Sequence, residues 1–167
     1  MPFSLTNAQE RVIKEIQDDM NKSRPMRRLV QGDVGSGKTV VAAGAMLTCA
    51  KNNFQSVLLC PTEVLAEQHF KNFSIWFASE NIDIEILTGK TKKKDWERID
   101  YDLRSGKIKI LIGTHSVFQK RVSMKNLSLV VVDEQQRFGV KQRFEMLQKS
   151  KEAVLPHQLF MTATPIP

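Results

Sequence analysis

Six short apolar runs recur along the chain, and a cluster of small or polar residues follows each one. The runs are RRLVQGD, SVLLCPT, DIEILTG, IKILIGT, LSLVVVDE and QLFMTAT, all rich in valine, isoleucine and leucine. Their apolar positions are continuous rather than alternating, which is typical of strands covered on both faces. The segments between them mostly show helical spacing. The pattern predicts a three-layer α/β domain, a doubly wound, mostly parallel sheet with helices on both sides.

The polar clusters at the ends of these runs predict where a ligand binds. They read GDVGSGKT, PTE, TGKT, GTHS, DEQQ and TATP. In open α/β sheets the carboxyl ends of the strands carry the ligand site. We therefore expect the six clusters to converge on one edge of the sheet.

The first cluster predicts a phosphate-binding loop. It fits the pattern GxxxxGK[ST] and stands between an apolar strand and a helix, as that motif requires. Lys38 is expected to reach the β- and γ-phosphates of a nucleotide, and the Thr39 hydroxyl to ligate magnesium. A glycine-rich turn with a solvated lysine is the alternative, and the flanking strand and helix argue against it. The nucleotide-binding residues predicted in this loop are Gly32, Gly35, Ser36, Gly37, Lys38 and Thr39.

The run LVVVDEQQ predicts the second half of an ATP site. Leu129 to Val132 read as a buried strand, with Asp133 and Glu134 at its end. Asp133 is expected to hold magnesium, and Glu134 to orient and deprotonate the attacking water. Neighbouring carboxylates on a strand point to opposite faces, so one can face the metal and the other the γ-phosphate. With Lys38, these two carboxylates are the predicted catalytic residues.

The remaining clusters distinguish a motor protein from other phosphate-binding proteins. PTEVLAEQ, TG, GTHS and TATP occur in that order around DEQQ, a succession that resembles the first motor domain of superfamily two helicases and translocases. The resemblance implies that the first three segments bind the nucleic-acid backbone, which hydroxyls and loop amides can do without reading bases. It also implies that the last segment couples hydrolysis to domain movement. The implied DNA-binding residues are Pro61, Thr62, Thr88, Gly89, Thr114 and His115, and the implied coupling residues are Gln136, Thr162, Ala163 and Thr164.

Longer stretches resemble the RecG family of bacterial ATP-dependent DNA helicases, which remodel stalled forks and branched junctions. The stretches are PFSLTNAQ, MRRLVQGDVGSGKT, PTEVLAEQHF, ILIGTHSVFQ, VVVDEQQRFGVKQR and HQLFMTATPIP. The transcription-repair coupling translocase is similar and stays an alternative, as does a non-catalytic nucleotide-binding module. RecG relatives usually carry histidine where this chain has Gln136, so the relay of hydrolysis is the point where it departs from the family.

The same resemblance implies domains beyond this segment. RecG-like proteins carry an N-terminal wedge domain and a second motor domain whose arginines complete the ATP site. We interpret residues 1–167 as a single first motor domain from such a protein. We expect it to be monomeric and, by itself, nearly inactive as an ATP hydrolase.

Three features allow two interpretations. In the family a glutamine equivalent to Gln9 bonds the adenine edge, and an aromatic residue, here Phe3, stacks near it. The spacing Thr6-x-x-Gln9 also fits a helix capping box, and the two roles are compatible. His115 either touches DNA or caps the next helix. Four lysines either form a solvated helix start or bind the DNA backbone; they are Lys90, Lys92, Lys93 and Lys94.

Composition indicates the charge of a binding partner and the cellular compartment. A net charge of +7 suits an anionic partner such as DNA. No apolar run approaches ~18 residues, and the N-terminus lacks a secretory pattern, so we expect a cytoplasmic protein without a membrane partner. The resemblance to RecG implies that this cytoplasm is bacterial. Cys49 and Cys60 stand in apolar contexts and are expected to be buried thiols. The three histidines lack metal-ligand spacing, and no zinc site is predicted.

Overall fold

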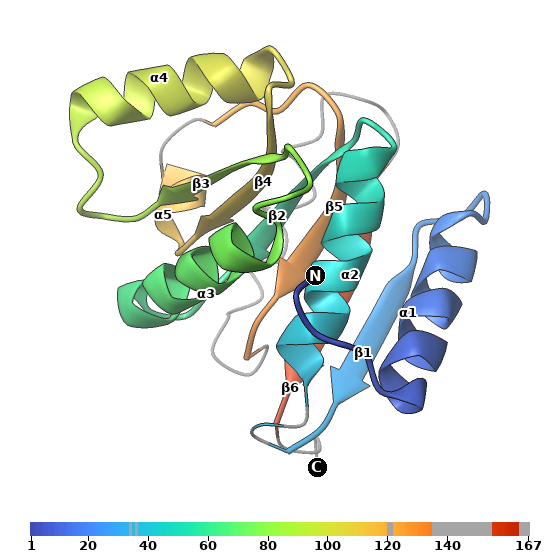
Figure 1. The fold of residues 1–167 in the computed structure, drawn as a ribbon. Helices are drawn as coiled ribbons and strands as arrows, with labels where there is room; N and C mark the ends of the chain where they lie inside the picture. The colour runs from blue at the N-terminus through green and yellow to red at the C-terminus, as the bar shows by residue number, and fades with distance from the viewer. Residues whose placement is uncertain (34, 36, 120–121, 135–154, 164–167) are drawn as a thin grey trace.

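A six-stranded parallel sheet forms the centre of the protein (Figure 1). The computed structural model describes residues 1–33, 35, 37–119, 122–134 and 155–163. The strands are β1 (Arg27–Gln31), β2 (Gln55–Leu59), β3 (Asp83–Leu87), β4 (Ile108–Gly113), β5 (Leu127–Val132) and β6 (His157–Thr162). Their order across the sheet is β1-β6-β5-β2-β4-β3, and every neighbouring pair is parallel. All six predicted strands and the predicted fold class are confirmed.

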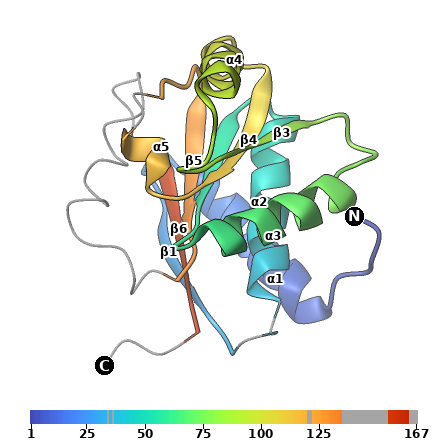
Figure 2. The same cartoon turned by 90° about the vertical axis from the view of Figure 1, so that its left-hand side faces the viewer.

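Helices cover both faces of the sheet (Figure 2). They are α1 (Asn7–Met20), α2 (Lys38–Lys51), α3 (Glu63–Trp76), α4 (Lys93–Arg104) and α5 (Ser116–Gln119). The first three pack on one face, against side chains that include Leu58, Ile110, Leu129 and Val131. The last two cover the other face, against side chains that include Val57, Leu59, Leu111 and Val130. Successive residues of the inner strands thus enter two separate cores, which explains their continuous apolar runs, whereas alternate residues of the edge strand β1 are exposed.

The first helix begins with the predicted capping box. The Thr6 hydroxyl accepts a hydrogen bond from the backbone N–H of Gln9 at 3.2 Å, and the Gln9 side chain accepts one from the backbone N–H of Thr6 at 2.9 Å. The helix then packs closely on α2, where a Cβ added to Gly44 would lie 2.7 Å from Cδ1 of Ile13. The glycine therefore allows α1 to lie beside the helix that follows the phosphate loop.

The carboxyl ends of the strands meet at one edge, as predicted. Backbone hydrogen bonds continue past the strand ends and join the polar segments: Gly32 to Thr162, Cys60 to Gly113, Thr114 to Leu87 and Asp133 to Leu59. The candidate site therefore lies along this edge. No helix in the described residues has both the length and the apolar composition needed to span a bilayer.

Candidate nucleotide and nucleic-acid site

The loop between β1 and α2 has the backbone of an anion-binding turn. Gly35 and Gly37 have φ angles of 82° and 86°, in the left-handed region that glycine tolerates best. Gly37 is the N-cap of α2, and it has no side chain to occupy the amides of the first helical turn. A helix N-terminus with such amides favours a negatively charged ligand. The predicted loop residues that are described here lie together, and Ser36 lies outside the described residues.

Lys38 lies across this loop. Its ammonium group donates hydrogen bonds to the carbonyl oxygens of Gly32 and Asp33, the second at 2.9 Å. Phosphate oxygens are charged acceptors and bind an ammonium group more strongly than neutral carbonyls do. A bound phosphate can therefore replace the carbonyls as the partner of Lys38.

The two predicted magnesium ligands lie in segments that follow two different strands. Thr39 is half-buried in the first turn of α2, after β1, and Asp133 directly follows β5. Only β6 separates β1 from β5, so the two strands lie about 10 Å apart. A hydroxyl and a carboxylate are the hard oxygen donors that magnesium prefers. The donor types at this edge fit a magnesium ion.

Asp133 has a partner that the sequence analysis missed. Its Oδ2 atom lies 2.8 Å from Nε2 of His69 on α3, and only 15% and 8% of the two side chains are exposed. The spacing of the histidines argues against zinc, and the sequence predicts no other role for His69. The available signal was its position with Ala66 and Phe73 on the buried face of α3, because a polar residue on such a face needs a partner.

The backbone at Glu134 differs from the extended strand that the sequence predicted. The strand ends at Val132, and Glu134 has a φ of 50°, so the alternating pleat of a strand does not set the directions of the two carboxylates. A left-handed conformation is costly for a residue with a Cβ, by roughly 1–2 kcal/mol, and the surrounding fold must hold it. The prediction that strand pleating points the two carboxylates to opposite faces is therefore wrong, because neither residue lies in the strand.

The two thiols are buried and free, as predicted. Burial raises the pKa of Cys49 to about 11. Burial also raises the pKa of Cys60, and the nearby negative charges of Asp133 and Glu134 raise it further. Cys60 is thus a neutral thiol beside the carboxylate pair.

A pocket of about 200 Å³ opens beside the phosphate loop, between α1 and α2. Its lining includes Gln9, whose Nε2 atom lies so close to Gly37 that a Cβ there would clash with it. Phe3 is outside this lining, and its ring meets Trp76 edge-on with 5.3 Å between centroids. Trp76 also stacks on Phe73 at 5.6 Å, and its partly buried ring packs against the core.

The threonines of the predicted DNA-binding segments shape their own loops. Thr62 caps α3 by accepting a hydrogen bond from the N–H of Leu65 at 3.2 Å, and it is exposed. Thr88 and Thr114 are only 6% and 3% exposed. Their hydroxyls bond within the turns that follow, to Lys90 N and to Ser116.

The exposed groups at these loops belong to neighbouring residues, Gly89 and His115. At the start of α5, the backbone N–H groups of Ser116 and Val117 donate hydrogen bonds to Thr114 rather than to His115. An ion pair of 3.4 Å between Glu63 and Lys90 joins the Pro-Thr and Thr-Gly segments. The Pro-Thr, Gly-Thr and Thr-Gly segments thus lie next to one another along the sheet edge.

Two of the implied coupling residues are described. Thr162 ends β6 and is buried, and its carbonyl accepts the hydrogen bond from Gly32 N at 3.3 Å. Ala163 follows it and is half-buried. This segment therefore contacts the phosphate loop directly. Gln136 and Thr164 lie outside the described residues.

The predicted lysine cluster begins a helix. Lys92 is the N-cap of α4 without a side-chain capping bond, and Lys93 and Lys94 are exposed in its first turn. Positive side chains at a helix N-terminus oppose the helix dipole. The solvated helix start is confirmed, and contact with DNA stays a prediction.

Replacing Lys92 with serine is expected to stabilise the protein by about 1 kcal/mol, because serine caps a helix and removes the unfavourable charge. DNA affinity should also depend less steeply on salt. The slope of the logarithm of affinity against the logarithm of salt concentration should fall in magnitude by about 1, because one phosphate contact is lost. Thermal unfolding and fluorescence anisotropy measure the two effects. The matched control is Lys14→Gln on the exposed side of α1. An identical slope change in that control would contradict a specific contact at Lys92.

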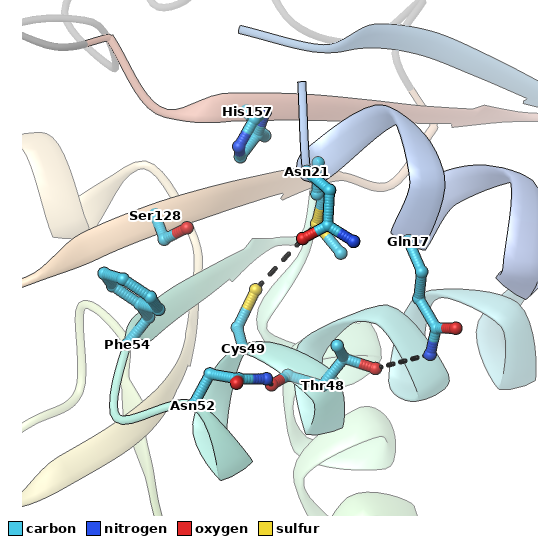
Figure 3. A pocket seen from close by; sticks show the side chains of 9 residues that line it. Gln17, Asn21, Thr48, Cys49, Asn52, Phe54, Ser128 and His157 are labelled. Carbon is cyan, nitrogen blue, oxygen red and sulfur yellow. Dashed lines mark hydrogen bonds between the residues drawn. The ribbon is translucent and has the colours of Figure 1, made fainter. Parts of the chain in front are cut away.

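A second pocket, of about 440 Å³, lies at the opposite end of the sheet (Figure 3). Ser128 and His157 line it from the starts of β5 and β6, and Thr48 and Cys49 line it from the end of α2. The His157 ring accepts a hydrogen bond from the N–H of Met26 at 2.9 Å. Burial lowers the pKa of His157, although a backbone hydrogen bond to Met20 opposes the shift. These groups join neighbouring elements and take no part in the site at the carboxyl edge.

Known proteins share this combination of fold and motifs. The model of the DEAD/DEAH box helicase family matches residues 6–167. The chain belongs to this family. It is also 50% identical to the ATP-dependent DNA helicase RecG of Haemophilus influenzae and 49% identical to that of Escherichia coli K12, over 100% of the chain in both cases. The resemblance to RecG is confirmed, and the chain spans 24% of the length of each relative.

Solved structures agree with the sequence relatives. A structure of RecG bound to a three-way DNA junction superposes with a TM-score of 0.87 at 44% identity, covering 100% of this chain and 22% of that one. The yeast DEAD-box splicing factor Prp28 superposes with a TM-score of 0.71 at 21% identity, covering 99% and 42%. At that identity Prp28 supports the helicase fold alone.

Proposed function

We propose that this chain is the first motor domain of a RecG-type DNA helicase, which uses ATP hydrolysis to remodel branched DNA in recombination and repair. One observation carries the proposal. The phosphate loop, the Asp133–Glu134 pair and the exposed Thr62, Gly89 and His115 all lie at the carboxyl edge of one sheet. The identity with RecG over the whole chain supports RecG rather than another helicase.

The residues of the loop bind and orient the nucleotide. Backbone amides around Gly37 and at the start of α2 bind phosphate oxygens, and Lys38 leaves the carbonyls of Gly32 and Asp33 to bind the β- and γ-phosphates. The side chain of Gln9 lies at the pocket beside Gly37 and is the candidate contact to adenine. Phe3 is the candidate for stacking near the base.

The carboxylates serve the hydrolysis step. Thr39 and Asp133 would hold magnesium, which when bound neutralises charge on the transferred phosphoryl group. Glu134 orients the attacking water and accepts its proton. Because Thr162 bonds to Gly32 of the phosphate loop, the Thr-Ala-Thr segment can respond to the state of the nucleotide.

The DNA contacts are to the backbone. Thr62, Gly89 and His115 present a hydroxyl, exposed main chain and an imidazole, which bind phosphates without sequence preference. The domain acts together with a wedge domain and a second motor domain of the same full-length protein, in the bacterial cytoplasm. The RecG structure on a three-way DNA junction and the two free buried thiols support this assignment.

The test is steady-state phosphate release by the full-length protein that carries this chain. With ATP and magnesium, we expect forked DNA to raise the turnover severalfold above the rate without DNA. Linear duplex DNA of the same length and base composition is the control. ATP binding without turnover on any DNA would instead indicate a nucleotide-dependent binding module, and would contradict the proposal.

A further inference from the structure

The hydrogen bond between His69 and Asp133 joins two parts of the site with different proposed tasks. Asp133 follows β5 and is the candidate magnesium ligand, while His69 lies on α3. The first residue before that helix is Thr62, its cap and a candidate DNA contact. Seven positions along a helix separate Thr62 from His69, a rise of about 10 Å. One helix therefore carries both the DNA-facing cap and the partner of the metal ligand.

The geometry assigns the donor. A carboxylate oxygen only accepts hydrogen bonds, so Nε2 of His69 carries the proton that it shares with Oδ2 of Asp133. The other ring nitrogen, Nδ1, is buried and has no hydrogen-bond partner among the described residues. Burying an imidazole with one nitrogen unpaired costs free energy. An apolar side chain would fill the same space without this free-energy cost, so packing alone does not explain a histidine at this position.

Asp133 is held at two points. Its backbone N–H donates to the carbonyl of Leu59 at 2.9 Å, which anchors the main chain to β2. His69 then holds Oδ2 at 2.8 Å. With both points occupied, the carboxylate has a defined orientation, and Oδ1 is its remaining oxygen donor. A metal ligand that is oriented in this way binds its ion more tightly than one that rotates.

We propose that His69 is a positioning residue that orients Asp133 for magnesium and ties this ligand to α3. The inference rests on the function proposed above. Because α3 is a rigid helix with Phe73 and Ala66 buried in the core, a movement of its Thr62 end on DNA is transmitted to His69 and to Asp133. The contact is thus a direct mechanical link between DNA binding and the metal site.

The test measures the magnesium concentration that gives half-maximal binding of a fluorescent ADP to the 167-residue chain. His69→Leu keeps much of the volume and removes the donor, and we expect the required magnesium to rise about 10–100-fold. His69→Gln places an amide donor near the position of Nε2 and should restore most of the dependence. A loss in both variants alike would overturn the proposal.

The matched control is Phe73→Leu, on the same buried face of α3. It removes packing from α3 and leaves the bond to Asp133, so we expect a lower melting temperature with unchanged magnesium dependence. Unchanged magnesium dependence in His69→Leu would overturn the inference alone. A chain of native sequence that binds ADP without any effect of magnesium would overturn the proposed function as well.

A second measurement needs no substitution and covers the case in which His69→Leu does not fold. The ring resonances of the three histidines are followed by nuclear magnetic resonance as magnesium is added to the ADP-bound chain. We expect those of His69 to shift, and those of His157, at the opposite end of the sheet, to stay unchanged. Unchanged His69 resonances would overturn the proposal.

Discussion

Replacing Lys38 with alanine is expected to weaken the binding of ADP or ATP to the chain by about 100-fold or more. Hydrogen bonds to charged groups contribute about 1.5–3 kcal/mol each, and Lys38 is proposed to make two of them, to the β- and γ-phosphates. The ammonium group bonds to the carbonyls of Gly32 and Asp33, so it already lies beside the loop that is proposed to bind phosphate. Titration calorimetry with ADP and magnesium measures the change.

The control for this experiment is Lys51→Ala, at the other end of the same helix. Lys51 pairs with Glu80 at 3.0 Å, far along α2 from the phosphate loop. This variant should bind nucleotide like the native chain. Thermal unfolding of both variants shows whether the loss of the two loop hydrogen bonds of Lys38 destabilises the fold. Full nucleotide affinity in a folded Lys38→Ala variant would refute the phosphate-loop assignment.

Replacing Glu134 with glutamine is expected to reduce ATP hydrolysis by the full-length protein by about 10²–10⁴-fold, the usual contribution of a general base. Glutamine keeps the size of the side chain and a hydrogen-bonding oxygen, but it cannot accept the proton of the attacking water. Nucleotide binding should therefore stay close to that of the native protein. Single-turnover phosphate release and ADP titration separate the two effects.

Glu97→Gln is the matched control, because it makes the same change on an exposed residue of α4. It should leave both hydrolysis and binding unchanged. The left-handed backbone of Glu134 makes a structural effect the main competing explanation, and thermal unfolding detects it. Hydrolysis at the native rate by a folded Glu134→Gln variant would mean that another group deprotonates the water.

The two substitutions test the proposed binding group and the proposed catalytic group separately. Lys38 lies after β1 and Glu134 after β5, with β6 between these strands. The Thr162 carbonyl of β6 bonds to the phosphate loop. The strand that carries the implied coupling segment thus lies between the proposed binding and catalytic groups, and we expect a change in nucleotide state to reach it from both sides.

The elements and the positions of the motifs could be predicted from the amino-acid sequence. The inner strands β2, β4, β5 and β6 are largely buried on both faces, so their apolar runs are continuous and visible without the structure, whereas the edge strand β1 exposes alternate residues. The start of α1 follows from Thr6 and Gln9, whose capping contacts span only three residues. The phosphate loop is equally local, since its glycines and Lys38 act within one turn. Such features depend on neighbours in the chain, which a single sequence displays.

Contacts between groups from distant segments depend on the packing of the whole domain and could not be predicted. His69 and Asp133 are 64 positions apart, and only the pairing of β2 with β5 brings α3 to the carboxylate. The burial of Thr88 and Thr114 and the left-handed turn at Glu134 also depend on the packing of several elements. Side-chain direction and exposure at the end of a strand follow from register and neighbours rather than from residue type, and for this reason the sequence predicted the candidate site but not its internal contacts.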